Sequence, residues 1–409
     1  MQKIIYPALL LGLLGMAGCQ SSTKKTDANM ANTPAVNTPN ADSVASTTST
    51  DATAITYKLP NPESFESLIG GKKTNLYILK GKGIDVAITN YGARIVGLLV
   101  PDKAGKQTDV VMGFESLAAY QKAHEGFYGP IVGRVGNRIA KGTFTLDGKT
   151  YHTELNNNGN TLHGGPSGFH TRVWDAKSIN GHTLQLTYVA KDGEGGFPGN
   201  LTTTVTYSID ESVAGQPGLK IDYKATTDKP TPVNPTSHGF FNLNGEGSGT
   251  INNHVLMINA DKYSAVDKGL IPQGEPQSVE GTPFDFRKPT AIGARVETKN
   301  EQLTFGGGYD HNWVLNHKMG SLDKAVEVVG DKSGIRMTVL TTEPAMQFYG
   351  GNFFAANDPG KYGKAAKFRE GLALEAQHYP DSPNHPSYPN TLLKPGQTYT
   401  QTTVYRFGK

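Results

Sequence analysis

Short stretches in which apolar and polar residues alternate recur along most of this chain, and they constrain its fold more than any other feature. Alternation with a period of two residues is typical of a β-strand that buries one face. Another stretch, GTFTLDGKTYHTEL (142–155), has Asp-Gly at its centre and predicts a hairpin. The clearest alternating stretches are LQLTYVA (184–190), LTTTVTYSI (201–209), LKIDYKAT (219–226), AVEVVG (325–330), IRMTVLTT (335–342) and YTQTTVYRF (399–407).

The same pattern limits the fold class. No amphipathic helix longer than about 12 residues is evident, and strands do not alternate with helices. Many short strands of this kind predict an all-β fold, either a large antiparallel β-sandwich or a barrel. No segment within residues 56–409 has the composition of a linker, so we expect one large domain there.

The N-terminus carries a different signal. MQKIIYPALLLGLLGMAGC combines one lysine with an apolar run too short to span a bilayer, which is the layout of a secretory signal. Ala17-Gly18-Cys19 resembles a bacterial lipobox, and this resemblance implies that residues 1–18 are removed and that Cys19 is acylated. A plain signal peptide is the alternative. Gln20 after the cysteine favours, by the same resemblance, the outer membrane facing the periplasm.

Residues 19–55 follow this leader and consist mainly of Ser, Thr, Asn, Ala and Pro. A segment with so few apolar side chains cannot bury a core, so we expect an acylated cysteine followed by a disordered tether. Leader and tether are therefore set apart from the folded domain.

Composition and motifs exclude several kinds of chemistry. The formal net charge is only +3 and the basic residues are scattered, which argues against nucleic-acid binding. The chain has no G-x-S-x-G elbow, no H-E-x-x-H motif, no cysteine pair and no dinucleotide-binding fingerprint. We expect neither an organic cofactor nor a metal.

Five polar segments interrupt the strand pattern. A single histidine or arginine in such a loop is more often structural than functional. Glu375 stands out because it lies within the apolar run Leu372–Ala376, where burial would raise the pKa of its carboxyl group. It is either a catalytic base or one partner of a buried ion pair. The segments are GRVGNRIAKG (133–142), NTLHGG (160–165), VNPTSHGFFNL (233–243), GGYDHNWVL (307–315) and LALEAQHYPDSPNHP (372–386).

These segments, together with MQFYGGN (346–352) and in this order along the chain, resemble the aldose 1-epimerase (galactose mutarotase) family. The resemblance extends from about Tyr57 to Phe407. It implies a large antiparallel β-sandwich, a supersandwich, with a sugar site on its open face. It also implies an isomerase that interconverts the α and β anomers of free aldoses such as glucose and galactose.

The resemblance also implies roles for individual residues. Glu375 in LALEAQ matches the catalytic base, and His238 in TSHGFFNL matches the catalytic acid. His163 in TLHGG matches a second histidine of the site, able to hydrogen-bond the ring oxygen or a nearby hydroxyl. The residues that match binders of sugar hydroxyls are Asn137, Arg138, Asp310 and Gln347. Trp313 either stacks on the sugar or belongs to the core.

Three rival functions are open at the level of sequence. A glycoside hydrolase needs a second carboxyl group, for which Asp310 is the candidate. A non-catalytic sugar-binding lipoprotein would not need both His238 and Glu375. An epimerase of a phosphorylated sugar would need an arginine cluster, whereas the motifs supply only Arg134 and Arg138. In each case the expected partner is a small sugar, contact with the membrane is through the anchor alone, and the chain is a monomer or weak dimer.

Overall fold

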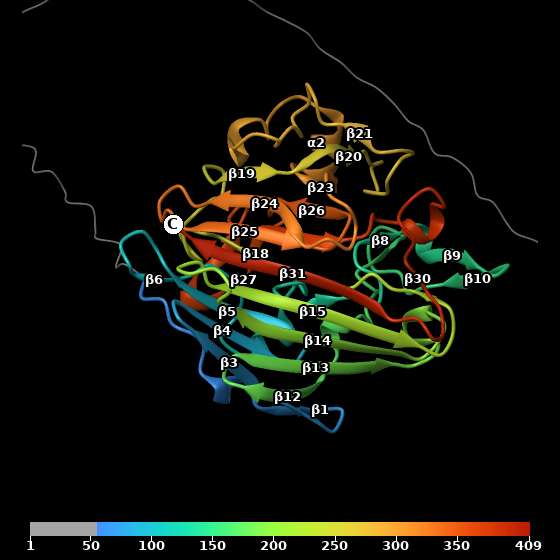
Figure 1. Cartoon of the computed structure of the whole chain (residues 1–409), viewed down its shortest axis with the longest axis horizontal. Helices are drawn as coiled ribbons and strands as arrows, with labels where there is room; N and C mark the ends of the chain where they lie inside the picture. The colour runs from blue at the N-terminus through green and yellow to red at the C-terminus, as the bar shows by residue number, and fades with distance from the viewer. Residues whose placement is uncertain (1–54) are drawn as a thin grey trace, which may run out of the picture. The chain divides into compact units, whose positions relative to one another are not determined.

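A nine-stranded antiparallel sheet forms one layer of the domain in the computed structural model, which describes residues 55–409. Most of its strands are seen side by side in Figure 1, from β12 to β19. The six alternating stretches of the sequence are β13, β14, β15, β24, β25 and β31, so these predictions are confirmed. In spatial order the strands are β12 (Asp175–Asn180), β13 (Thr183–Ala190), β14 (Leu201–Asp210), β15 (Gly218–Thr227), β31 (Tyr399–Gly408), β25 (Arg336–Thr341), β24 (Asp323–Val329), β19 (Val255–Ile258) and β22 (Thr290–Ala291).

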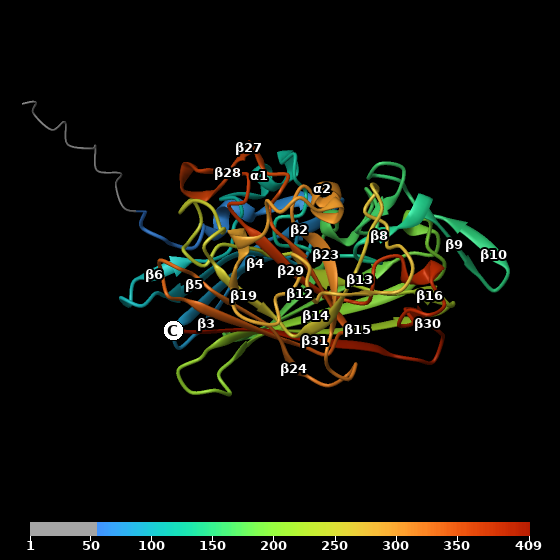
Figure 2. The ribbon, with the colours of Figure 1, turned by 90° about the horizontal axis from the view of Figure 1, so that it is seen from above.

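Two further sheets pack on one side of this layer, as Figure 2 shows. The six-stranded sheet has the order β18 (Phe240–Phe241), β29 (Leu372–Gln377), β26 (Ala345–Tyr349), β23 (Asp310–Leu315), β20 (Ala260–Ser264) and β21 (Gln277–Ser278). The four-stranded sheet comprises β3 (Leu76–Gly81), β4 (Ile84–Thr89), β5 (Arg94–Pro101) and β6 (Gln107–Asp109). The predicted large antiparallel β-sandwich is therefore confirmed.

Short strand pairs, two α-helices and seven short 3₁₀ helices complete the described part of the chain. The predicted hairpin is β9–β10, and its turn residues Asp147 and Gly148 have φ of 49° and 75°, as an Asp-Gly turn requires. Helix α1 (Leu117–Lys122) is capped by Ser116, and α2 (Glu301–Gly306) by Asn300. The strand pairs are β1 (Ser67–Ile69) with β2 (Lys72–Thr74), β7 (Ile131–Val132) with β17 (Thr236–Ser237), β8 (Arg138–Ile139) with β11 (Thr161–Leu162), β9 (Thr143–Leu146) with β10 (Lys149–His152), β16 (Thr231–Pro232) with β30 (Leu392–Leu393), and β27 (Ala355–Pro359) with β28 (Ala365–Lys367).

The two faces of the six-stranded sheet differ in chemistry. Trp313 pairs with Met346, which pairs with Ala376, and these residues face the core shared with the nine-stranded sheet. Because side chains alternate along a strand, the residues next to them point to the opposite face. On that face Gln347 of β26 pairs with Asn312 of β23 on one side and with Glu375 of β29 on the other. The register thus places polar side chains together on the outer face, where the candidate site lies.

Candidate active site

Glu375 occupies the middle of β29 and is almost fully buried. One of its oxygens, Oε2, has no hydrogen-bond partner in the described structure. Burial raises the pKa of this carboxyl group well above its ordinary value, and the nearby Asp310 carboxyl raises it further, while Arg138 opposes both effects. Glu375 therefore has the raised proton affinity that a general base working near neutral pH needs.

His238 lies in the short link between β17 and β18, and its backbone is fixed on both sides. Its N–H donates to the carbonyl of Pro130, and its own carbonyl accepts from the N–H of Gly129. The ring nitrogen Nε2 faces Glu375 Oε1 at 3.6 Å. Burial lowers the pKa of His238 to about 4.

The opposite pKa shifts of this pair suit proton exchange through a substrate. A neutral carboxyl group beside a neutral imidazole and a carboxylate beside an imidazolium hold the same total number of protons. The two forms differ only in which group carries the shared proton. Burial favours the neutral pair, whereas attraction across 3.6 Å favours the charged pair. The site can therefore alternate between the two forms without gaining or losing a proton.

His163 reaches the same site from the end of β11. Its neighbours Gly164 and Gly165 have φ of 85° and 79°, and a Cβ at Gly164 would overlap the carbonyl of Gly133. Only glycine fits this close approach of two backbones. The turn sets the His163 ring edge-on to that of His238, with ring centroids 5.0 Å apart.

The protonation state of His163 follows from its hydrogen bond. Its Nδ1 accepts from the backbone N–H of Asn137 at 3.1 Å, and burial lowers its pKa well below the ordinary value. The neutral ring therefore carries its proton on Nε2 and acts there as a donor. His163, His238 and Glu375 form the one described group whose ligand atoms, all within 4.8 Å of one another, could hold a metal ion. A neutral His163 with Nδ1 engaged and Nε2 protonated offers no free lone pair, so this donor set is poorly suited to a metal.

The remaining predicted residues form a row beside Glu375 and His238 that is joined by hydrogen bonds and one ion pair. Gln347 Nε2 donates to Asp310 Oδ1 at 2.7 Å, and Arg138 Nη2 lies 3.9 Å from Asp310 Oδ2. Asn137 accepts from the N–H of Arg138 through its side-chain oxygen, at 2.8 Å. All four side chains are buried or nearly so. The structure therefore brings together all seven residues singled out in the folded domain.

The sequence analysis did not identify two aromatic residues near the site, Phe127 and His170. The Phe127 ring lies 4.7 Å from that of His163 and 5.7 Å from that of His238, measured between centroids. The same ring lies 4.8 Å from His170, whose pKa burial lowers to about 3. Phe127 follows Gly126 in a loop with no strand pattern, so the sequence carries no signal for either contact.

Other candidates from the sequence are structural. Trp313 is fully buried and its Nε1 donates to the carbonyl of Phe284, so it belongs to the core. Arg134 donates to the carbonyls of Pro198 and Gly199 and lies over the ring of Phe197. Neither side chain belongs to the row of polar groups beside Glu375.

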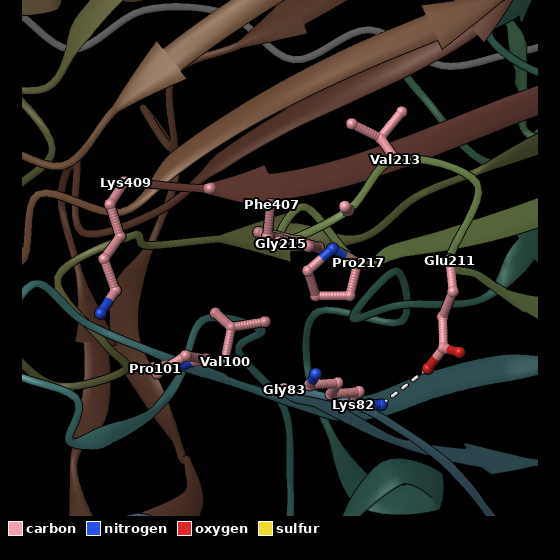
Figure 3. Close-up of a pocket in the computed structure, with 12 residues that line it drawn as sticks. Lys82, Gly83, Val100, Pro101, Glu211, Val213, Gly215, Pro217, Phe407 and Lys409 are labelled. Atoms are coloured by element: carbon pink, nitrogen blue, oxygen red, sulfur yellow. Dashed lines mark hydrogen bonds between the residues drawn. The ribbon is translucent and has the colours of Figure 1, made fainter.

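A separate pocket of about 480 Å³ lies between the β3–β4 turn, β5 and the end of β31 (Figure 3). Glu211 is its acidic residue and accepts from the backbone N–H of Lys82 at 2.7 Å. Val100, Pro217 and Phe407 supply much of its apolar wall. It contains no carboxylate–imidazole pair, so the proton chemistry lies elsewhere, at Glu375 and His238.

None of the helices within residues 55–409 has the length and apolar character needed to cross a membrane.

Solved structures define the class of the fold. The GalM/aldose epimerase homologue from C. elegans superposes with a TM-score of 0.74 at 31% identity, over 82% of this chain and 99% of that one. The galactose 1-epimerase from Lactobacillus acidophilus gives a TM-score of 0.72 at 28% identity, over 84% and 97%. The domain is thus a β-sandwich of the galactose mutarotase type.

Sequence comparisons agree with this class. The aldose 1-epimerase family model matches residues 75–406. The galactose mutarotase of Bos taurus is 41% identical over 83% of this chain and 95% of its own length. The aldose 1-epimerase of Escherichia coli K12 is 37% identical over 81% and 94%. The chain belongs to the aldose 1-epimerase family.

Proposed function

We propose that this enzyme interconverts the α and β anomers of free aldoses of the glucose and galactose type, with Glu375 as base and His238 as acid. The observation that carries the proposal is the buried pair in which His238 Nε2 faces Glu375 Oε1 at 3.6 Å. Arg138, Asp310 and Gln347 beside it offer the donors and acceptors that vicinal hydroxyls require.

The chemistry needs two proton transfers. Glu375 removes the proton from the C1 hydroxyl, and the electron pair of that O–H bond forms the carbonyl as the bond between C1 and the ring oxygen breaks. His238 gives its proton to the departing ring oxygen. The pair passes from carboxylate and imidazolium to carboxyl and imidazole, the form that burial favours. Rotation about C1–C2 and the reverse transfers close the ring on the other face.

The neighbouring groups support these transfers. His163 donates from Nε2 to an oxygen of the substrate, because its Nδ1 already accepts from Asn137. Asp310, held by Gln347 and Arg138, orients a pair of hydroxyls. Each positioned proton transfer contributes about 10²–10⁴ in rate.

Polarimetry tests this proposal. The purified domain, residues 56–409, is mixed with freshly dissolved α-D-glucose or α-D-galactose, and the decay of optical rotation is followed. Decay well above the buffer rate, lost in both Glu375→Gln and His238→Ala, supports the two roles. Sugar binding without accelerated decay would instead indicate a sugar-binding protein, and decay only with sugar phosphates an epimerase of modified sugars.

We also propose that the enzyme is lipid-anchored in the bacterial envelope and faces the periplasm, at the outer membrane. Residues 1–18 would be a signal peptide, Cys19 the acylated residue and residues 19–55 a tether to the domain 56–409. This rests on the sequence, since residues 1–54 lie outside the described structure. Metabolic labelling with palmitate followed by membrane fractionation tests it, because Cys19→Ala should abolish both the label and the membrane association.

A further inference from the structure

A short segment outside the helices and strands, residues 126–130, supports the backbone of His238. We call it the support loop. The N–H of Gly129 donates to the His238 carbonyl, and the His238 N–H donates to the carbonyl of Pro130, both at 2.9 Å. The Phe127 ring of the same loop lies 5.7 Å from the His238 ring, measured between centroids. The position of the acid therefore depends on what holds this loop in place.

The buried side chain of Arg94 holds the support loop. Arg94 is the first residue of β5 and is only 2% exposed. Its Nη1 donates to the carbonyls of Gly126 and Tyr128 at 3.1 and 2.5 Å, and its Nη2 donates to the carbonyl of His170 at 3.1 Å. His170 belongs to the 3₁₀ helix η3 (Phe169–Thr171). One guanidinium thus joins β5, the support loop and η3.

The backbone from which Arg94 projects is itself fixed. Gly92 and Ala93 form a turn before β5, with φ of 74° and 47°. A Cβ at Gly92 would lie 2.6 Å from the carbonyl oxygen of His170, so only glycine fits this close approach. The Ala93 carbonyl accepts from the hydroxyl of Tyr207 in β14 at 2.7 Å. The support loop is therefore braced, through Arg94, against the core of the sandwich.

The surroundings of Arg94 indicate a use for its charge. Its hydrogen bonds go to carbonyl oxygens, and its Nε has no hydrogen-bond partner in the described structure. The rings of Tyr120 and Tyr91 lie 4.6 and 5.7 Å from its Cζ and add a weaker attraction. Burying a guanidinium, which stays charged at ordinary pH, is costly. A neutral side chain could bind one or two of these carbonyls without that cost.

The charge of Arg94 acts on the His238 ring. Burial is the main cause of the lowered pKa of His238, and the Arg94 charge acts in the same direction. An imidazolium near a fixed positive charge releases its proton more readily, which assists transfer to the ring oxygen of the sugar. The other titratable groups near His238 are Glu375 of β29, His163 at the end of β11 and His170 of η3.

We propose that Arg94 is a positioning residue for the acid His238. Its guanidinium fixes the support loop, and its charge assists release of the proton from the imidazolium. Arg94 acts through the loop and through its electric field, without contact with the sugar. This inference rests on the proposed epimerase function and adds to the site a residue from a strand of the other sheet, β5.

Two substitutions separate the contributions of the guanidinium. Arg94→Lys keeps the charge but loses the planar fork, whereas Arg94→Gln keeps two N–H donors and loses the charge. In polarimetry with glucose and galactose, both should lower kcat about 10- to 100-fold and change KM by less than about twofold, because the loop positions the acid and not the sugar.

The pH profile of kcat/KM reports the charge. Its acid limb is where His238 and Glu375 together take up a second proton. A positive charge opposes that uptake, so its removal in Arg94→Gln should move the acid limb to higher pH by about 0.5–1 unit, as expected for one partly screened charge. Arg94→Lys should keep the acid limb of the wild type. A purely structural role would move neither profile.

Arg134→Gln is the matched control, because Arg134 is also buried and donates to two carbonyls, those of Pro198 and Gly199. It should lower Tm and leave kcat and the pH profile unchanged. The inference is overturned, with the epimerase function intact, if either Arg94 variant keeps the wild-type kcat or if the acid limb of Arg94→Gln does not move. If Arg94→Gln fails to fold, Arg94→Lys decides alone: a reduced kcat at unchanged KM supports the inference and a wild-type kcat overturns it. A wild-type domain that accelerates mutarotation of neither sugar would overturn the proposed function as well.

Discussion

Glu375→Gln should make the enzyme less active and, at alkaline pH, more stable. Gln keeps the size of the side chain but cannot accept the C1 proton, so we expect kcat to fall by about 10²–10⁴. The stability gain arises because Glu375 is buried with Oε2 unpaired. The two effects have opposite signs, so a folding defect cannot account for the loss of activity.

The size of the stability gain can be worked out from this site. An ionised carboxylate buried without a partner costs at least about 1–3 kcal/mol in desolvation, and a neutral Gln at the same position avoids the charged part of that cost. With an unfolding entropy of about 2.1 cal/mol/K per residue, that range corresponds to about 1–4 °C in Tm for a domain of this length.

The gain should depend on pH in a defined direction. Burial raises the folded-state pKa of Glu375 above its ordinary value of 4.5. Below that ordinary value the group is neutral in both the folded and the unfolded state, so ionisation contributes no difference between wild type and variant. As pH rises toward the folded-state pKa, only the unfolded chain ionises freely, and the wild type loses stability that the variant keeps.

Calorimetry at pH 4.5 and pH 8 measures both Tm values. Glu343→Gln is the matched control, since Glu343 is equally buried but its Oε2 contacts His378 Nδ1 at 2.6 Å. Removing a charge that has a partner should lower Tm rather than raise it. The reasoning would be refuted by a Glu375→Gln variant with the same Tm difference from wild type at both pH values, or with a lower Tm at pH 8.

Three further predictions follow from the same geometry. His238→Ala should lower kcat by about 10²–10⁴. Combining it with Glu375→Gln should add little, because the two groups act in one step. Additive losses of activity, measured by polarimetry, would contradict this. Arg138→Met removes charge-assisted contacts worth about 1.5–3 kcal/mol, so it should lower kcat/KM about 10- to 100-fold, mainly by raising KM. An unchanged KM would place Arg138 outside the sugar site. Trp313→Phe should cost about 1–3 kcal/mol of stability by leaving the Phe284 carbonyl without its donor. Thermal melts measure that loss, and a raised KM would mean that Trp313 contacts sugar after all.

Part of the site could be anticipated from sequence because its motifs are local. Glu375 lies in a six-residue apolar strand, and that context alone predicts burial and a raised pKa. Gly164 and Gly165 predict a sharp turn beside His163, and both have positive φ. The role of His238 as catalytic acid came from the resemblance to a family. Residue chemistry alone left several functions open.

The sequence by itself determined which segments become strands. Alternation of side chains and the Asp-Gly turn act over a few residues, so LTTTVTYSI and the β9–β10 hairpin were predictable without knowledge of their partners. The leader and tether, residues 1–55, rest on the sequence alone and stay predictions.

Only the tertiary structure decided which residues meet. The pairing of Gln347 with Glu375 depends on the register between β26 and β29, and the contact of Phe127 with His163 depends on a loop tied down by Glu125. These contacts join segments distant in the chain, and long-range pairing is set by how all the sheets bury their apolar faces together rather than by any local pattern.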